Sequence, residues 1–235
     1  MPQPRNQTTS PDPKRSVIFD LDGTLADTSA DLIAAANACF RRLGKGDLLD
    51  PMLDAETAFN GGRAMLRLGF GRQDIPWVEA DIDRQYPYLL QYYAENIDRH
   101  TRLYDGVVPM LEQLAVEGYG LGICTNKPAA LAETLLARLG IRAHFGSMLG
   151  ADSLPVRKPD PAPLFEAIRR LGSMADRSVL IGDTMTDRLT ATAAGIPCVL
   201  VTFGPESRDV AAMMPEALLD HYRDLPAILT SLKLR

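Results

Sequence analysis

The sequence predicts an α/β protein in which a doubly wound parallel sheet carries an inserted, all-helical cap domain. Four short apolar runs have the composition of strands buried on both faces, and segments with helical periodicity separate them. Strands that alternate with helices in this way form parallel sheets. The four runs are residues 17–19, 121–124, 179–181 and 198–201.

Glycine ends each of the predicted crossover helices. Leu131, Leu135 and Leu139, for example, form one apolar stripe that stops at Gly140. Glycine is common just past a helix because it adopts the left-handed backbone conformation without strain. The corresponding glycines of the other three helices are Gly118, Gly172 and Gly195.

The stretch from residue 28 to residue 100 has helical periodicity and no convincing strand. One apolar stripe runs from Leu32 to Leu43, and a second runs from Val78 to Ile97. Pro87 lies inside the second stripe, where we expect it to kink or split the helix. A helical block placed between two strands cannot join the sheet, so it is expected to cover one end of it.

These patterns predict the domain organisation. We expect residues 14–27 and 101–235 to form the α/β core domain and residues 28–100 to form the helical cap domain. Residues 1–13 contain four prolines and no apolar residue after Met1, so they are expected to be a disordered tail and not a signal peptide.

Charge and cysteine content limit the possible partners and compartment. The 235-residue chain has a net charge of -5 and no cluster of Lys or Arg, so we expect no binding to nucleic acid or to a membrane. Three widely spaced cysteines, Cys39, Cys124 and Cys198, match no zinc motif and cannot all pair, which favours reduced thiols in a cytoplasmic protein. No feature of the sequence predicts the oligomeric state.

Polar side chains collect where the predicted strands end. Asp20 and Asp22 follow the first strand, Thr125 and Asn126 follow the second, and Asp183 follows the third, with Asp187 four residues later. The carboxyl ends of parallel strands form the ligand site of an open sheet. Carboxylates gathered there would repel one another unless a hard cation compensates them, and this donor set suits Mg²⁺.

The other groups near the strand ends suit a phosphoryl group. Thr125 offers a hydroxyl, Lys158 an ammonium, and the turn after Cys124 backbone N–H groups. One of the two acids at residues 20 and 22 can attack phosphorus to form an aspartyl-phosphate, and its neighbour can serve as acid and then base. The alternative for this acid pair is a solvated turn that caps a helix.

From Lys14 onward, the sequence resembles the haloacid dehalogenase superfamily of hydrolases, whose core is a Rossmann-like sheet. Four motifs in the superfamily's order carry the resemblance, together with a helical insert after the first. They are Asp20-Leu21-Asp22-Gly23-Thr24, Thr125 in ICTNKP, Lys158 in RKPDP, and Gly182-Asp183 with Asp187 in IGDTMTD.

The resemblance implies a role for each matching residue. Asp20 would be the nucleophile and a Mg²⁺ ligand, and Asp22 the general acid and base that also gives a backbone carbonyl to the metal. Asp183 would be a further metal ligand, while Asp187 would bind the metal or orient its waters. Thr125, Asn126 and Lys158 would hold the phosphoryl group, with Lys158 also pairing with Asp20.

Within the superfamily the sequence looks most like the phosphoglycolate phosphatase branch, which implies Mg²⁺-dependent hydrolysis of a small phosphorylated metabolite, 2-phosphoglycolate. A sugar phosphate, a nucleotide or pyrophosphate is an alternative substrate. Dehalogenases lack an acid at the position of Asp22, so dehalogenation is disfavoured. Hexose-phosphate mutases usually have Val at the position of Thr24, which disfavours a mutase. Phosphonate-cleaving relatives use a cap lysine, and Lys45 is the only lysine between residues 27 and 125. A phosphomutase and a noncatalytic phosphoacceptor module, such as a receiver domain, remain less favoured alternatives. One departure from the superfamily is Arg188, where relatives commonly have an apolar residue.

Some residues admit a functional and a plain structural interpretation. Gly61, Gly62 and Arg63 are either a turn that starts a helix or a cap loop that presents N–H groups and a cation to the substrate. Asp27 is expected to cap the helix that begins near Ser29, and Thr184 to be a turn residue.

Overall fold

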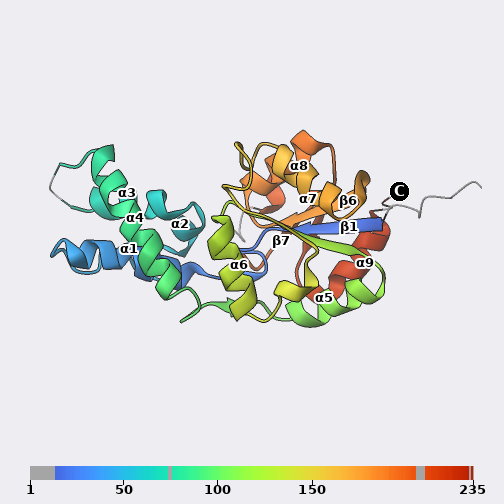
Figure 1. The fold of residues 1–235 in the computed structure, drawn as a ribbon, viewed down its shortest axis with the longest axis horizontal. Helices are drawn as coiled ribbons and strands as arrows, with labels where there is room; N and C mark the ends of the chain where they lie inside the picture. Colours follow the sequence, from blue (N-terminus) through green and yellow to red (C-terminus); the bar gives the residue numbers. More distant parts are fainter. Residues whose placement is uncertain (1–13, 74–75, 205–209, 233, 235) are drawn as a thin grey trace, which may run out of the picture.

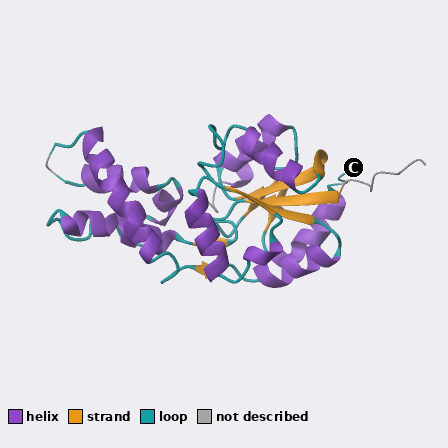
Figure 2. Ribbon diagram, viewed as in Figure 1, coloured by secondary structure: helices purple, strands orange, loops and turns teal. Residues whose placement is uncertain are grey.

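The computed structural model describes residues 14–73, 76–204, 210–232 and 234, so the expected tail at residues 1–13 lies outside the described residues. A sheet with helices on both faces occupies one half of the molecule, and the helices α1 to α4 occupy the other half (Figure 1). Figure 2 shows the strands between the two helical layers. Among the described residues, no helix combines the length and the apolar character that crossing a membrane requires.

The main sheet has six strands, all parallel, in the order β5-β4-β1-β6-β7-β8. The chain runs outward from β1 in one direction through β4 and β5, and in the other direction through β6, β7 and β8. The predicted doubly wound parallel sheet is confirmed. In sequence order, the strands are β1 (Lys14–Phe19), β4 (Gly120–Cys124), β5 (Ser147–Leu149), β6 (Ser173–Gly182), β7 (Cys198–Val201) and β8 (Ala217–Leu219).

Alternate residues of the central strands pack on opposite faces of the sheet. Ile18, Leu180 and Leu200 belong to one apolar cluster, with residues of the helices on that side. Val17 and Phe19 belong to the other cluster. Because successive side chains of a strand point to opposite faces, continuous apolar runs are what a sheet covered on both faces requires.

Helices cover both faces of the sheet. Helices α7 and α8 pack on one face, and α5 and α9 lie on the other (Figure 1). Helix α8 ends at Gly195, which has the left-handed φ of +66° that the glycine stop signal predicts. The helices are α5 (Val107–Val116), α6 (Ala129–Arg138), α7 (Ala162–Arg170), α8 (Met185–Ala194) and α9 (Leu225–Ser231), with 3₁₀ turns at Arg142–His144, Val210–Met213 and Tyr222–Asp224.

Between strands β2 (Ala26–Asp27) and β3 (Arg102–Leu103), the described residues form four helices, which we call the helical segment. They are α1 (Ser29–Arg42), α2 (Ala55–Phe59), α3 (Gly62–Gly71) and α4 (Glu79–Glu95). Helix α1 packs against the other three. Gly69 allows α3 to approach α1 closely, because a Cβ atom there would lie 2.1 Å from the Phe40 ring. Pro87 does not split α4, contrary to one of the two expectations for it, and the helix continues through residue 95.

The two chain connections to the helical segment lie side by side. Strand β2 (Ala26–Asp27) pairs antiparallel with β3 (Arg102–Leu103). The buried carboxylate of Asp31 on α1 accepts hydrogen bonds from the backbone N–H groups of His100 and Thr101 and from the Thr101 hydroxyl. The residue at the N-cap position of α1 is Thr28 and not Asp27, contrary to expectation. Asp27 lies one residue earlier, and its Oδ1 accepts the N–H and the hydroxyl of Ser29.

Candidate active site

The candidate site lies where the order of the strands reverses. Asp20 directly follows β1, and its N–H bonds the carbonyl of Ile181 on the neighbouring strand β6 at 2.9 Å. Thr125 directly follows β4, and Asp183 directly follows β6. Since β4 and β6 flank β1, the sheet brings these three strand ends together at one edge.

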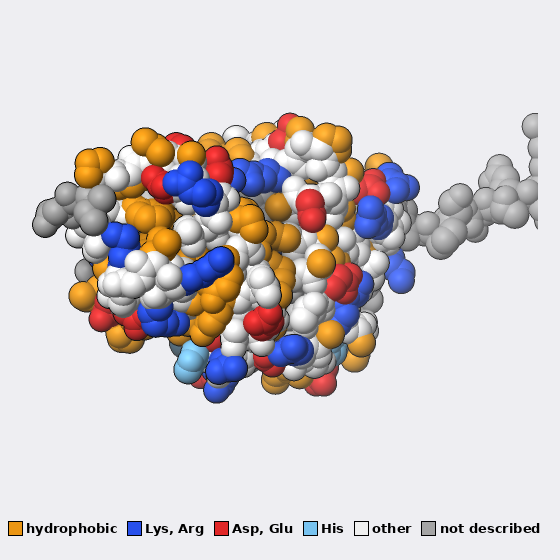
Figure 3. Space-filling model, turned by 60° about the vertical axis from the view of Figure 1, so that its left-hand side comes forward, with side chains coloured by type: hydrophobic (Ala, Val, Ile, Leu, Met, Phe, Trp, Pro, Cys, Tyr) orange, Lys and Arg blue, Asp and Glu red, His pale blue; other side chains and the backbone are white. Residues whose placement is uncertain are grey.

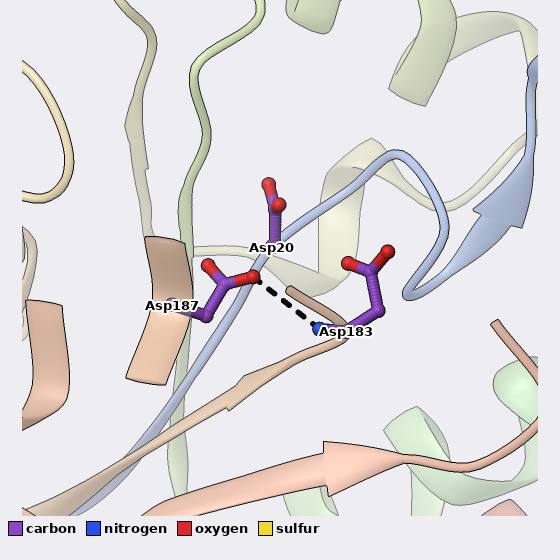
Figure 4. Close-up of side chains that lie close together, drawn as sticks. All are labelled: Asp20, Asp183 and Asp187. Atoms are coloured by element: carbon purple, nitrogen blue, oxygen red, sulfur yellow. Dashed lines mark hydrogen bonds between the residues drawn. The ribbon is translucent and has the colours of Figure 1, made fainter. Parts of the chain in front are cut away.

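Three acids gather at this edge. Carboxylate oxygens of Asp20, Asp183 and Asp187 lie within 4.8 Å of one another, and Figure 4 shows the three carboxylates pointing to the same side. Burial raises the pKa of Asp20 to about 6, with Lys158 opposing the shift and the like charges of Asp187 and Asp22 adding to it. Burial, together with the charges of Asp187 and Asp20, also raises the pKa of Asp183 well above its usual value.

The donor set of this acid cluster fits a hard cation. Oδ1 of Asp183 accepts a hydrogen bond from the Thr24 hydroxyl at 2.8 Å, but its buried Oδ2 has no hydrogen-bond partner among the described residues. A buried carboxylate oxygen without a partner is costly, and coordination of a divalent cation would remove both this cost and the mutual repulsion. The cluster can therefore hold a metal ion.

Two glycines make room for the acids. A Cβ atom at Gly23 would lie 2.2 Å from Oδ2 of Asp183, and a Cβ atom at Gly182 would lie 2.4 Å from Cβ of Asp187. Gly23 also has a φ of +76°, which side-chain-bearing residues rarely adopt. Gly23 of the first motif and Gly182 of the fourth are therefore needed because any side chain there would collide with an acid of the site.

Lys158 brings a buried cation to the same cluster. Its Nζ lies 2.6 Å from Oδ1 of Asp187 and 3.1 Å from Oδ2 of Asp20. Burial lowers the pKa of Lys158, but the two carboxylates outweigh it and raise the pKa above its usual value. Lys158 is therefore a permanent positive charge beside Asp20.

Asp187 accepts hydrogen bonds from four protein donors. Its Oδ1 accepts Lys158, and its Oδ2 accepts the Thr184 hydroxyl at 2.8 Å and the N–H groups of Asp183 and Thr184. The structure thus shows Asp187 orienting Lys158 and closing the first turn of α8. Thr184, expected as a turn residue, is the residue that precedes α8 and binds Asp187.

Asp22 lies apart from the acid cluster and has its own partners. Its two carboxylate oxygens accept Nζ of Lys127 at 2.8 and 3.0 Å, and Oδ1 also accepts the Thr28 hydroxyl at 2.7 Å. Nζ of Lys127 in turn donates to the hydroxyl of Tyr93 on α4 at 2.9 Å. Asp22 is therefore bonded to Lys127 of the core and is linked through Lys127 to Tyr93 of the helical segment.

Thr125 and Asn126 hold the loops around the site. The buried Thr125 donates its N–H to the carbonyl of Leu149, and its hydroxyl accepts the N–H of Lys127 at 3.2 Å. The side-chain amide of Asn126 donates to the carbonyl of Lys158 at 3.0 Å, so it ties the loop after β4 to the loop that carries Lys158.

A cavity of about 280 Å³ connects the strand ends with the helical segment. Asp20, Asp22, Thr125, Asn126 and Lys158 line it on the core side. The residues from α2 to α4 that line it include Gly61, Gly62, Arg63, Tyr86 and Tyr93. The cavity is of the size and position expected for a small-molecule site, with reactive groups on one wall.

Gly61, Gly62 and Arg63 lie both at the start of a helix and at the cavity, the two positions that the sequence offered as alternatives. Gly61 precedes α3 and Gly62 begins it, so they start a helix, and both also line the cavity. The Arg63 guanidinium pairs with Asp83 at 2.7 Å and lies 4.7 Å from the centre of the Tyr86 ring. Arg63 therefore reaches the cavity wall already paired with a carboxylate.

Comparisons with known proteins decide the family. The haloacid dehalogenase-like hydrolase family matches residues 17–201. The chain belongs to this family. It is 38% identical over 208 residues to a phosphoglycolate phosphatase of Mesorhizobium japonicum, covering 88% of this chain and 90% of that protein. A phosphoglycolate phosphatase of Agrobacterium fabrum is 33% identical, with 92% of both chains covered.

A solved structure shows the same fold. The crystal structure of a predicted phosphoglycolate phosphatase from Haemophilus somnus has a TM-score of 0.83 and 28% sequence identity, and the match covers 92% of this chain and 97% of that one. The expected membership of the haloacid dehalogenase superfamily is confirmed, and so is the expected class of enzyme, a phosphoric monoester hydrolase.

For this haloacid dehalogenase-like hydrolase, sequence reasoning did not identify two residues at the site. Lys127 lies in the ICTNKP motif but received no role from the sequence, although its place two residues beyond Thr125 was a usable signal. Tyr93 carried no such signal, because it lies in the apolar stripe of α4. Arg188, whose role the sequence left open, bonds the carbonyl of Met213 and pairs with Glu216, so it joins α8 to the segment before β8.

Proposed function

We propose that this protein is a Mg²⁺-dependent phosphatase that hydrolyses 2-phosphoglycolate through an aspartyl-phosphate on Asp20. The observation that carries the proposal is the position of Asp20 on the cavity wall, where it belongs to the acid cluster and faces the buried ammonium of Lys158. A nucleophilic carboxylate, a cation site and a phosphate-binding cation then meet at one point, as phosphoryl transfer requires. The names of the similar proteins support the choice of substrate.

Asp20 and Asp183 would hold the metal, with the backbone carbonyl of Asp22. Oδ2 of Asp183 is the oxygen that lacks a protein partner, which makes it the natural ligand atom. Asp187 was proposed as a ligand or as a residue that orients the metal's waters, and the four protein donors that it already accepts favour the orienting role. Bound Mg²⁺ would supply positive charge that neutralises the carboxylates and the phosphoryl oxygens.

The residues of the cavity wall supply the two halves of the reaction. A carboxylate oxygen of Asp20 attacks phosphorus, and the bond from phosphorus to the ester oxygen breaks. Asp22 in its acid form gives a proton to that oxygen as the alcohol leaves. Asp22 then takes a proton from water, which attacks phosphorus and releases phosphate with Asp20 restored. Thr125 and Lys158 hold the phosphoryl oxygens during both steps.

The cavity suits a small anion with two charged ends. On the face shown in Figure 3, Lys and Arg side chains are interspersed with acidic and apolar ones, so capture of an anion depends on cations at the cavity itself. Lys158 is committed to the phosphoryl end. Arg63 and Arg157 also line the cavity, and we propose Arg63, with the N–H groups near Gly61 and Gly62, as the partner of the substrate carboxylate.

A panel of phosphate esters tests the substrate. With Mg²⁺, kcat/KM is expected to be highest for 2-phosphoglycolate among 2-phosphoglycolate, sugar phosphates, nucleotides and pyrophosphate. A higher kcat/KM for another ester would make that ester the proposed substrate, and the proposed phosphatase reaction would stand. Absence of phosphate release from every ester would refute the function, and the phosphoacceptor module would then be favoured.

A pair of arginine variants tests the carboxylate contact. Arg63→Ala is expected to lower kcat/KM for 2-phosphoglycolate about ten- to a hundredfold more than for an aryl phosphate, because a hydrogen bond to a charged group is lost. Arg67→Ala is the matched control, since Arg67 is on the same helix and pairs with Glu79 but does not line the cavity. An equal loss of kcat/KM on both esters would mean that Arg63 acts by packing against Tyr86. Arg157 would then be the next candidate for binding the substrate carboxylate.

A further inference from the structure

Lys127 has a buried ammonium that bonds one carboxylate and one phenol hydroxyl. The exposed fraction of its side chain is only 3%, and its Nζ contacts both carboxylate oxygens of Asp22 and the hydroxyl of Tyr93. The two oxygens belong to one carboxylate, so they lie on the same side of the ammonium, and the Tyr93 hydroxyl lies on another. Although Lys127 lines the cavity, its ammonium is thus directed at Asp22 and Tyr93.

Stability alone does not account for this arrangement. Removing a charged pair from water costs several kcal/mol per ion, and apolar residues of similar volume often replace buried pairs without loss. Here the pair lies at the wall of the cavity, where the side chain of Asp22 retains 18% exposure. The structure thus keeps a carboxylate at the cavity by surrounding it with donors.

The backbone of Lys127 is held as firmly as its side chain. Its N–H donates to the Thr125 hydroxyl, and its carbonyl accepts the N–H of Ala151 at 2.9 Å. Gly150 allows this approach, since a Cβ atom there would lie 2.8 Å from the carbonyl oxygen of Lys127. The ammonium is thereby fixed relative to Thr125, a residue proposed to bind phosphate.

Tyr93 supplies the contact from the helical segment. It is 1% exposed and is part of α4, and it presents its hydroxyl to Lys127. Burial raises the pKa of Tyr93 to about 12, so the phenol stays neutral at physiological pH. Thr28, directly before α1, is the other donor to Asp22 from this side.

We propose that Lys127 and Tyr93 are positioning residues that orient the carboxyl group of Asp22 toward the leaving-group oxygen. Lys127 fixes Asp22 to the core, and Tyr93 makes that orientation depend on the place of α4. The inference rests on the proposed function, in which Asp22 moves the proton. Neither residue touches the reacting atoms.

The inference predicts which substrates are sensitive to these residues. The leaving group of an alkyl phosphate is poor and must be protonated as it departs. The leaving group of a nitrophenyl phosphate is nitrophenolate, which departs as a stable anion. Because kcat/KM covers the steps up to release of the leaving group, misplacing Asp22 should lower kcat/KM for the alkyl ester selectively.

Two substitutions test this, each with a matched control. Lys127→Met keeps the length of the side chain and removes the charge, and Tyr93→Phe removes one oxygen and keeps the ring. Lys45→Met and Tyr92→Phe are the controls, because neither Lys45 nor Tyr92 lines the cavity. The assay is kcat/KM for 2-phosphoglycolate and for nitrophenyl phosphate with Mg²⁺, and thermal unfolding verifies folding.

We expect Lys127→Met to lower the ratio of the two kcat/KM values about ten- to a hundredfold, part of the ~10²–10⁴-fold that general acid catalysis contributes. Tyr93→Phe should lower the ratio less. The double variant should equal Lys127→Met, because Tyr93 acts through Lys127. Neither control should change the ratio.

An unchanged ratio in both variants would overturn the inference, as would full additivity of the two substitutions. If Lys127→Met fails to fold, Tyr93→Phe decides alone, because it keeps the charge and the packed ring. Activity of the wild-type protein distinguishes a failure of the proposed function from a failure of the positioning role. No phosphate release by the wild type would refute the proposed function, whereas active wild type with an unchanged ratio in the variants would refute only the positioning role.

Discussion

At the scale of single residues, the environment of Asp20 orients the carboxylate that we propose as the nucleophile. Its Oδ1 accepts the N–H of Leu21 at 2.7 Å, and its Oδ2 faces Lys158 at 3.1 Å. These donors orient the two oxygens, while burial and the nearby acids disfavour the charged form. A cation bound to the acid cluster would lower the pKa of Asp20 and favour its charged form.

Asp20→Asn is expected to abolish turnover, because an amide neither attacks phosphorus nor contributes charge to the metal site. Phosphate release with Mg²⁺ is the measurement. Asp176→Asn, the same change at an exposed residue of β6, is the control and should retain wild-type activity. Turnover by Asp20→Asn at the wild-type rate would contradict the mechanism.

At the scale of elements, the turn between β1 and β2 shapes the acid cluster. Gly23 sits between the two aspartates of the first motif and the Thr24 side chain that holds Asp183. Its N–H donates to the carbonyl of Ala26, which closes the turn. The backbone of this turn contacts Asp183 so closely that a side chain at residue 23 has no space.

Gly23→Ala should therefore weaken Mg²⁺ binding and lower activity, since the new methyl group would displace Oδ2 of Asp183. Gly46→Ala is a matched control, because Gly46 has a similar φ of +72° but no atom within 4 Å of the added Cβ. Both variants carry the strain of a left-handed residue, about 1 kcal/mol. The concentration of Mg²⁺ that gives half-maximal activity should rise in Gly23→Ala alone, and an equal rise in both would assign the effect to strain.

At the scale of the whole molecule, the helical segment and the sheet are joined at a few well-bonded points. Asp31 accepts hydrogen bonds from His100 and Thr101, and β2 pairs with β3 beside it. The cavity lies beyond this junction, with the proposed catalytic acids on one wall and α3 and α4 on the other. Changes at the junction should thus affect both the stability of the fold and the shape of the cavity.

Asp31→Asn is expected to reduce the free energy of unfolding by about 2–4 kcal/mol, because the amide NH₂ would face buried N–H donors that now bond a carboxylate. Denaturant unfolding measures the change. Asp98→Asn is the control, since Asp98 makes a partly exposed ion pair with Arg138 and should cost about 0–1 kcal/mol. Similar losses in both variants would show that the Asp31 contacts are unimportant for stability.

The stability of the metal-free protein should depend on pH through the acid cluster. The pKa of Asp20 is raised from 3.8 to about 6 in the folded protein, so between these values the folded state binds more protons than the unfolded state. The stabilisation is complete below about pH 4 and is lost as pH rises through about 6. Relative to Asp20→Asn, the chelated wild type should lose about 2–3 kcal/mol over this range.

Urea unfolding of both proteins across this pH range, with a chelator and then with Mg²⁺, tests this expectation. Added Mg²⁺ should restore the stability of the wild type near neutral pH. A wild type that gained stability relative to Asp20→Asn as the pH rose from about 4 to about 7 would have the wrong sign and would contradict the pKa assignment.

The sequence by itself determined the fold class, the family and the four motifs, because each depends on signals local in the chain. Apolar runs, glycine stops and acids at strand ends are all read within a few residues. The edge strands β5 and β8 escaped sequence reasoning because each has only three residues.

Only the tertiary structure decided which donors hold Asp22 and Asp187. Lys127 meets Asp22 across 105 residues and Tyr93 across 34, and no periodicity predicts such contacts. Lys158 meets Asp187 across 29 residues in the same way. The physical reason is that a buried charge takes its partners from whatever the packed strands and helices bring beside it, and that neighbourhood exists only once the chain has folded.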